Sequence, residues 1–591
     1  MPSRNKRIAL VLAGAAGLAL SLPAIGQNAP ESLLPPGFGD TPPPPSPTPG
    51  GPAPLLPSGT LTTEVPPTGE ELAGEEPEEE EKGEPVELPD AARRPIDVVG
   101  ALTDGNGGLG DDAFGRANGT FLTRLMRRID APVASRWGSI LLRRALLTRA
   151  PTPPDVDPTD WIAERAWLLL RMGEADAARM LVESVDTDKL SPKLIVVAQQ
   201  VALATGDPAG MCRLTTGAAQ FTKEKSWDYA RAICASLSGE GAIASALLDQ
   251  ARGKARRGID FLLAEKVIGA GANTRRAAMI EWADADALTT WRFGLATAVG
   301  LAIPDDLYAT VGPHVRAWQA RSPMFPAQDR LDAAAIAATL GVFSNAALVD
   351  LYAQAADSEG DVDRDTPTAR LRAAYVGDDD AARMSAISAL WEGAGEKPGG
   401  LYAYQILTAR AAAGLAPSDS LSADYGRLIA SMLSAGLDRQ AARWASLVEA
   451  EGKADDAWAL LAVGAPRRIV TITPGRVEDY ASSLNEEAKY KAGLLIAALG
   501  GLGRLTPAQM SQLAEDLEVP IATRNRYTQI LDRAAARGEQ GTVAVLAAAG
   551  LQTNGWKNVP AFHLYHIIGA LRRAGNEPAA RMIAAEALSR A

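Results

Sequence analysis

The chain of 591 residues has few side chains of the kinds that build metal sites and reactive centres. It contains 2 cysteines, 3 histidines and 5% aromatic residues, against 47% apolar residues. Its histidines are His314, His563 and His566. The last two lie three residues apart in "FHLYHII", but that helical stretch has no Cys, Asp or Glu to complete a metal site, so we interpret them as a structural pair. We therefore expect neither a metal nor a cofactor.

Motifs of covalent catalysis are missing as well. The sequence has no G-x-S-x-G turn for a serine nucleophile and no C-x-x-C pair. The stretch "GNGGLG" at 105–110 matches the dinucleotide pattern G-x-G-x-x-G, but the loop-like "DDAFGRANG" follows it where a helix would have to begin. We therefore predict a flexible loop at this position and a protein that is not an enzyme.

An excess of one charge is confined to a single segment. The net charge is −12, and most of it falls between Glu64 and Asp90, where twelve acidic residues stand against Lys82 alone. The remainder of the chain is close to neutral, with both signs mixed. A nucleic-acid partner requires a basic surface, so we expect none.

The first 26 residues are typical of an export signal. Arg4, Lys6 and Arg7 precede an apolar run from Ile8 to Leu20, and "SLPAIG" supplies small residues for a cleavage site. An apolar run of this length is short for a bilayer-spanning helix, which needs about 20 residues. We therefore expect a cleaved signal peptide over 1–26 and a periplasmic mature chain without an integral membrane span. An uncleaved inner-membrane anchor carrying a periplasmic domain is the alternative.

Residues 27–95 are rich in proline and glutamate. Proline stiffens such a segment and the glutamates repel one another, so it cannot bury a core. We predict a disordered, extended linker, which serves as a spacer or, alternatively, as an acidic docking segment.

Both cysteines, Cys212 and Cys234, follow the predicted export signal. In an oxidising compartment two such thiols tend to form a disulfide. Their surroundings, "GMCRLTTG" and "YARAICASL", indicate two neighbouring helices. A disulfide between them would hold one helix hairpin together, with a stabilisation of ~3 kcal/mol for a loop of this size.

One phrase occurs three times, as "GEADAARM" from Gly173, "GDDDAARM" from Gly377 and "GNEPAARM" from Gly575. An amphipathic stretch precedes each glycine, and polar or turn-forming residues follow it. Glycine at such a position ends a helix in the left-handed conformation, and the polar residues cap the next helix. We therefore predict that each copy is the turn of a helix hairpin, in which the Ala-Ala pair lets two helices pack closely.

Looser copies of this turn fill the intervals between the three. They begin at Gly206, Gly239, Gly341, Gly436, Gly452 and Gly538. Gly173, Gly206 and Gly239 are spaced 33 residues apart, and a period in the middle thirties with two helices per period is typical of a helix-hairpin solenoid. The predicted fold class is therefore all-α, an α-α superhelix of antiparallel helix hairpins.

The glycine turn followed by Ala-Ala, at this period, resembles the tetratricopeptide repeat over residues 150 to 590. The Trp-Leu-Gly-Tyr pattern and the closing proline of that family are not regularly present, so other helix-hairpin arrays, such as Sel1-like repeats, stay open. The resemblance implies a concave face that binds proteins or peptides.

The sequence divides into four parts after the linker. Residues 96–150 are predicted to form a glycine-rich lead-in and two N-terminal capping helices, and 151–466 a first solenoid block. The β-like run "RRIVTITPGRVEDY" at 467–480 is predicted to be an extended connector, or alternatively a short strand pair at a functional groove. Residues 481–591 then form a second solenoid block.

Four arginines follow the Ala-Ala pairs at equivalent positions. They are Arg179, Arg383, Arg443 and Arg581. We consider them a candidate interaction surface along one edge of the array, although solvated arginines paired with nearby acids would show the same pattern. The function expected is a non-enzymatic periplasmic scaffold or adaptor for other cell-envelope proteins or peptides. The alternatives are an atypical peptidoglycan-active protein, similar to lytic transglycosylases that contain a helical superhelix, and a component of an envelope secretion machine.

Overall fold

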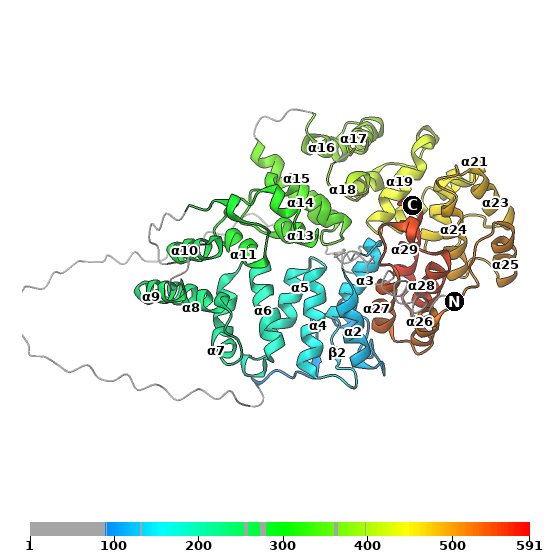
Figure 1. The fold of residues 1–591 in the computed structure, drawn as a ribbon. Coiled ribbons are helices and arrows are strands. Elements are labelled where there is room, and N and C mark those ends of the chain that lie inside the picture. The colour runs from blue at the N-terminus through cyan, green and yellow to red at the C-terminus, as the bar shows by residue number, and fades with distance from the viewer. Residues whose placement is uncertain are drawn as a thin grey trace, which may run out of the picture. The chain divides into compact units, whose positions relative to one another are not determined.

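The structure is a computed structural model, and it describes Pro89 and residues 92–591 apart from 131–132, 253–257, 272–278, 360–364 and 396. The predicted signal peptide 1–26 and nearly all of the predicted linker 27–95 lie outside the described residues. The described chain is all-α, as predicted, and most of its helices follow one another as hairpins (Figure 1). The described strands are β1 (Val98–Val99) and β2 (Ala150–Pro151), which pair antiparallel.

The first half of the array contains α2 (Gly119–Arg128), α3 (Arg136–Leu147), α4 (Pro158–Arg171), α5 (Ala175–Glu183), α6 (Pro192–Ala204), α7 (Thr215–Ala218), α8 (Lys225–Leu237), α9 (Gly241–Arg252), α10 (Ile259–Gly271), α11 (Thr290–Ala298), α12 (Asp305–Tyr308), α13 (His314–Arg321), α14 (Ala327–Thr339) and α15 (Asn345–Glu359). Short 3₁₀ helices join some of them, at η2 (Asp104–Asn106), η3 (Thr187–Lys189), η4 (Pro208–Leu214) and η5 (Trp282–Asp284).

The second half contains α16 (Pro367–Val376), α17 (Asp380–Glu392), α18 (Gly400–Gly414), α19 (Tyr425–Ser434), α20 (Asp438–Ala442), α21 (Ala445–Glu451), α22 (Asp456–Gly464), α23 (Pro474–Ser483), α24 (Tyr490–Gly501), α25 (Pro507–Asp516), α26 (Arg526–Ala536), α27 (Gln540–Gly550), α28 (Ala561–Arg573) and α29 (Glu577–Ser589). Its 3₁₀ helices are η6 (Asp419–Asp424) and η7 (Trp556–Asn558).

Glycine ends a helix at the predicted turns. Eight of the nine glycines of the repeated phrase and its looser copies have a φ between 64° and 90°, the left-handed region that glycine adopts without strain. Gly377 is the exception, since its φ is −56°. The hairpin break between α16 and α17 is present there, but the predicted left-handed conformation is wrong. At this turn the Asp379 side chain caps α17 by accepting a hydrogen bond from Ala382 N at 2.8 Å.

The second half of the predicted connector at 467–480 is helical. Residues 467–473 have no helix or strand, whereas Pro474 begins α23. Thr473 caps this helix and Pro474 occupies its first turn, where the missing N–H of proline costs nothing. The extended prediction is therefore wrong from Pro474 onward.

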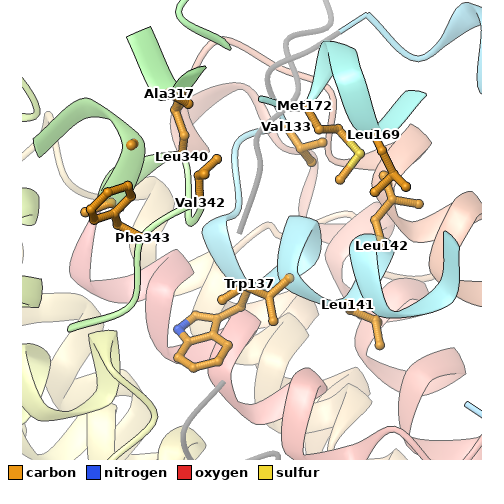
Figure 2. Close-up of a cluster of buried hydrophobic side chains, with 14 of the residues drawn as sticks. Val133, Trp137, Leu141, Leu142, Leu169, Met172, Ala317, Leu340, Val342 and Phe343 are labelled. Carbon is orange, nitrogen blue, oxygen red and sulfur yellow. The ribbon is translucent and has the colours of Figure 1, made fainter. Parts of the chain in front are cut away.

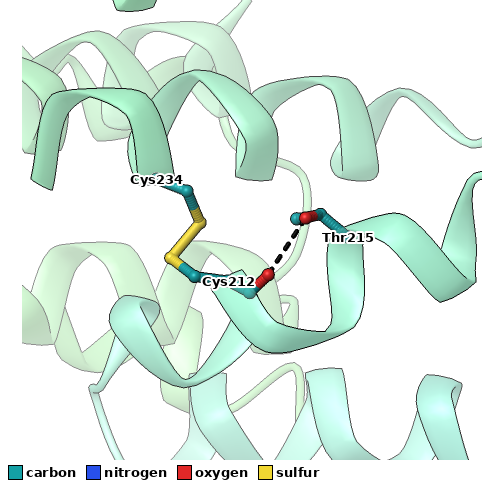
Figure 3. Close-up of a disulfide and its surroundings, with 3 residues drawn as sticks. All are labelled: Cys212, Thr215 and Cys234. Atoms are coloured by element: carbon teal, nitrogen blue, oxygen red, sulfur yellow. Dashed lines mark hydrogen bonds between the residues drawn. A yellow bond between two sulfur atoms is a disulfide. The ribbon is translucent and has the colours of Figure 1, made fainter. Parts of the chain in front are cut away.

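The two cysteines form the predicted disulfide. Cys212 lies in η4 and Cys234 in α8, with their Cα atoms 5.5 Å apart (Figure 3). Thr215 Oγ1 donates a hydrogen bond to Cys212 O at 3.0 Å and closes the turn between η4 and α7. The disulfide thus joins a 3₁₀ helix to an α-helix.

Helix α3 packs against the C-terminal end of the array as well as against α4. Its neighbours include α27 and α29. In a simple array each hairpin contacts only the hairpins next to it, so this packing adds a connection that the repeat pattern does not contain. Apolar side chains of α3, of the α4 region and of the segment from Ala317 to Phe343 belong to one buried cluster that includes Trp137 (Figure 2).

Polar contacts fix the beginning of α3 at this junction. The Glu586 carboxylate, 3% exposed, accepts hydrogen bonds from Ser135 Oγ at 2.7 Å, Arg136 N at 2.8 Å and Trp137 N at 3.1 Å. A carboxylate is favourable at this end of a helix because the first backbone N–H groups have no intrahelical partner.

The Arg136 guanidinium, also buried, donates to three backbone carbonyls of other hairpins. They are Ala338 O at 3.0 Å, Ser434 O at 2.8 Å and Phe343 O at 3.2 Å. One side chain of α3 therefore connects α14, the turn before α15 and the end of α19.

Candidate functional site

The four arginines predicted to form an interaction surface have different environments. Arg179 in α5 pairs with Glu183 at 2.6 Å and with Asp207 at 2.8 Å. Arg383 in α17 donates to Gly377 O at 3.0 Å and approaches Asp380 at 3.3 Å. Both are partly exposed and engaged with their own hairpin or the next one.

The other two arginines contact the ends of neighbouring helices. Arg443 is exposed and donates to Ala413 O, near the end of α18, at 3.3 Å. Arg581 is 6% exposed, pairs with Asp438 at 2.7 Å and donates to Gly464 O, the last residue of α22, at 2.6 Å. Because Arg581 is buried, it is not part of an exposed surface, and the prediction is wrong at this residue.

This use of arginine recurs through the fold. Helix-terminal carbonyls lack intrahelical partners and have partial negative charge, so a cation there is stabilising. Arg171 donates to Ile129 O and Met126 O at the end of α2, and Arg504 donates to Ala462 O near the end of α22. Neither Arg171 nor Arg504 belongs to the repeated phrase, so sequence spacing gave no signal for them.

A pocket of about 440 Å³ lies between α25, the segment 521–524, α26 and α28. Its apolar side consists of Met510, Ala514, Ile521 and Ala522. Its polar side consists of Ser511, Arg524, Asp532, Tyr565, His566 and Arg573. This α25–α28 pocket is the candidate functional site, because charged and polar groups converge there beside an apolar wall.

Asp532 interacts with two other charged or titratable side chains of the α25–α28 pocket. Its two carboxylate oxygens lie 2.5 Å from Arg573 Nη2 and 2.9 Å from His566 Nδ1. His566 is buried, whereas Arg573 is nearly half exposed. The carboxylate is thus engaged by two side chains of α28, and the second cation of the pocket, Arg524, is exposed at its rim.

The other two histidines have aromatic neighbours. His563 lies 4.9 Å from the Tyr527 ring, and His314 lies 5.1 Å from the Trp318 ring. Burial lowers the pKa of each to about 4, with a smaller contribution from His566 on His563 and from Arg171 on His314. Both rings are therefore neutral at pH 7. In the described part of the chain, no three His, Cys, Asp or Glu side chains are placed to hold a metal ion.

A second pocket, of about 490 Å³, lies among α18, α19, α22 and α23. Asp455 and Asp456 line it together with Arg427. Asp456 accepts a hydrogen bond from Tyr480 Oη at 2.8 Å and pairs with Lys491 at 3.2 Å. Acidic groups thus outnumber basic ones in the lining of this α18–α23 pocket, the reverse of the α25–α28 pocket.

A peptidoglycan-active enzyme would need a carboxylic acid at its substrate site, so the buried glutamates bear on this alternative. The described residues include four of them, Glu164, Glu174, Glu539 and Glu586. Each is in an ion pair, with Arg127 and Lys193, with Arg143, with Arg537 and with Arg590, respectively. Burial raises the pKa of Glu174, which Arg143 opposes at 2.9 Å. None of the four lines either pocket.

The glycine-rich stretch at 105–110 begins in η2 and continues as a turn and loop, and its backbone groups form hydrogen bonds within the chain. Gly108 N donates to Thr103 O at 2.7 Å, and Arg144 Nε donates to Gly107 O at 2.6 Å. The next helix, α2, begins only at Gly119. A pyrophosphate would need amide groups at a helix start directly after the glycines, and this arrangement does not provide them.

No family model, curated protein or solved structure matches this chain. Among the residues that the structure describes, none of the helices has both the length and the apolar character that crossing a bilayer requires.

Proposed function

We propose that the protein is an exported, periplasmic interaction scaffold without enzymatic activity, built from tetratricopeptide-like helix hairpins, and that it binds segments of other cell-envelope proteins. The disulfide between Cys212 and Cys234 supports an oxidising compartment. The all-α hairpin array supports the repeat class at the level of architecture.

One observation carries the choice of a scaffold over a peptidoglycan-active enzyme. A glycosidase-type mechanism needs a carboxylic acid held at the substrate with its proton available. Each buried glutamate of the described chain forms an ion pair with a cationic side chain, and none of them lines either pocket. The α25–α28 pocket instead combines an apolar wall with charged groups, as small recognition sites do.

Site-specific crosslinking in intact cells tests this function. A photoreactive phenylalanine analogue replaces Ser511, which is exposed and lines the α25–α28 pocket, and the same analogue replaces Lys189, which is exposed in η3, as the control. We expect a discrete envelope-protein adduct from position 511 and none of that mass from position 189. Identical adducts from both positions would contradict binding at the pocket.

The enzyme alternative has its own test. Purified protein is incubated with isolated peptidoglycan, and soluble fragments are measured. We expect none above the buffer control. Fragment release above the buffer control would overturn the proposed function.

A further inference from the structure

We propose that the α25–α28 pocket binds the carboxylate of an acidic side chain within a short apolar segment of a partner protein. This inference rests on the proposed function and names the ligand chemistry of the same site. It follows from the charges of the lining, the partners of those charges and the apolar wall beside them.

The first step is the charge balance. The lining contains two guanidinium groups, Arg524 and Arg573, and one carboxylate, Asp532. Asp532 is already paired with Arg573 at 2.5 Å and lies 2.9 Å from His566 Nδ1. Arg524 forms no ion pair with any residue in the described part of the chain. The pocket therefore has one positive charge in excess, and it favours an anion.

The second step separates a carboxylate from a phosphate. Phosphate sites typically use free amide groups at a helix N-terminus. Here α26 begins beside Arg524, but none of residues 525–528 lines the pocket, and the Asn525 side chain accepts a hydrogen bond from Thr528 N at 2.9 Å. The apolar side of the pocket includes Met510 and Ile521. A single carboxylate flanked by an aliphatic side chain fits both halves of the pocket.

The third step is the placement of Arg524. The segment that leads to it leaves α25 through Glu518, one of only two non-glycine residues with positive φ among those the structure describes, at 53°. Ile521, two residues after Val519, is buried and anchors the segment against the pocket. The backbone at Arg524 thus lies between the buried Ile521 and the capped start of α26, and its exposed side chain lines the pocket.

Fluorescence anisotropy with labelled short peptides tests the proposal. The probes are a peptide of alternating Leu and Glu, the same peptide with Gln for Glu, and the same with Lys for Glu. We expect the Glu peptide to bind about tenfold more tightly than the Gln peptide, because a hydrogen bond to a charged group is lost in the latter. We expect the Lys peptide to bind no better than the Gln peptide. Equal binding of the Glu and Gln peptides would overturn the proposal.

Variants of the full chain assign the binding to the pocket. Arg524 is exposed and unpaired, so the Arg524→Gln variant should keep its fold. We expect this variant to bind the Glu peptide about tenfold more weakly. Arg524→Glu should remove the preference for the Glu peptide over the Lys peptide. The matched control is Arg467→Gln, which is exposed, lies outside both pockets and leaves binding unchanged. An equal effect of Arg524→Gln and Arg467→Gln would contradict the assignment.

Competition with millimolar inorganic phosphate distinguishes the two anions. We expect phosphate to leave the bound Glu peptide in place at constant ionic strength, and full displacement would assign the pocket to a phosphorylated ligand instead. If position 511 crosslinks a partner while the Glu peptide fails to bind, the ligand chemistry is wrong and the scaffold function stands. If both fail, the pocket has no binding role.

Discussion

Two hairpins with the same sequence phrase occupy very different environments. In "GNEPAARM" of the α28–α29 hairpin, Ala579, Ala580, Arg581 and Met582 are all buried. In "GDDDAARM" of the α16–α17 hairpin, Ala381 and Ala382 are exposed, Arg383 is partly exposed and Met384 alone is buried. The phrase therefore specifies the turn between two helices, and it does not specify what the second helix packs against.

The difference comes from the neighbours of the second helix. Helix α29 packs against α3, α19, α22, α24 and α28, whereas the main neighbours of α17 are α16 and α18. Polar groups of α29 must therefore find partners away from water, because an unpaired buried polar group is costly. The partners that they find lie far along the chain.

The largest effect should come from Glu586, which connects α29 to the beginning of α3. Glu586→Ala leaves the amides of Arg136 and Trp137 and the hydroxyl of Ser135 without their acceptor. We expect a loss of about 4 kcal/mol in the free energy of unfolding, measured by urea denaturation. The control is Glu183→Ala, an exposed partner of Arg179, which should cost less than about 1 kcal/mol. Equal costs would show that Glu586 is no more buried in solution than Glu183.

The next largest effect is expected at Arg581, which we compare with Arg383 at the equivalent position of the α16–α17 hairpin. Arg581→Met removes the partner of the buried Asp438, so we expect a loss of about 3 kcal/mol, and Arg383→Met, at the exposed position, should cost less than about 0.5 kcal/mol. Adding Asp438→Asn to Arg581→Met should recover part of the loss, because the uncompensated charge disappears. A similar cost at both arginines would contradict the difference between the two hairpins.

Local features of this fold could be predicted from the sequence, and distant contacts could not. The hairpin turns at Gly173 and Gly575 depend on a glycine and a few polar neighbours, and the disulfide depends on there being only two cysteines. The contact between Arg136 and Glu586 joins residues 450 positions apart, and no periodicity within a repeat indicates it.

The candidate site was missed for the same reason. The sequence pattern pairs His566 with His563, but the charged neighbour of His566 is Asp532, which lies on another helix, α26. Arg573 belongs to the basic end of α28 that the sequence shows, but its pairing with Asp532 depends on how α26 and α28 pack. The arginine pattern, by contrast, indicates an interaction surface. In the structure, Arg443 and Arg581 instead donate hydrogen bonds to carbonyls at or near helix ends.

A smaller effect distinguishes how the two turns are held. In the α28–α29 hairpin Gly575 has a φ of 90°, and the Asn576 side chain makes no capping hydrogen bond to α29. Gly575→Ala should therefore cost about 1 to 2 kcal/mol, since alanine resists the left-handed region, and Gly575→Asn should cost less. Differential scanning calorimetry of the three proteins checks this order, and an unchanged melting temperature for Gly575→Ala would show that the turn has another conformation.

The smallest effect belongs to the α16–α17 turn, where the Asp379 side chain caps the start of α17 and no left-handed glycine follows α16. Asp379 accepts a hydrogen bond from Ala382 N at 2.8 Å, and its charge lies at the positive end of α17. We expect Asp379→Ala to cost about 1 kcal/mol or less. Because α17 has few neighbours, the loss should appear first as faster hydrogen exchange of the amides in α17, before any change in the global unfolding midpoint. Asp378→Ala, one residue earlier and exposed, is the matched control and should leave that exchange unchanged. If both variants accelerate exchange equally, then net charge near the helix start, and not the cap, stabilises this turn.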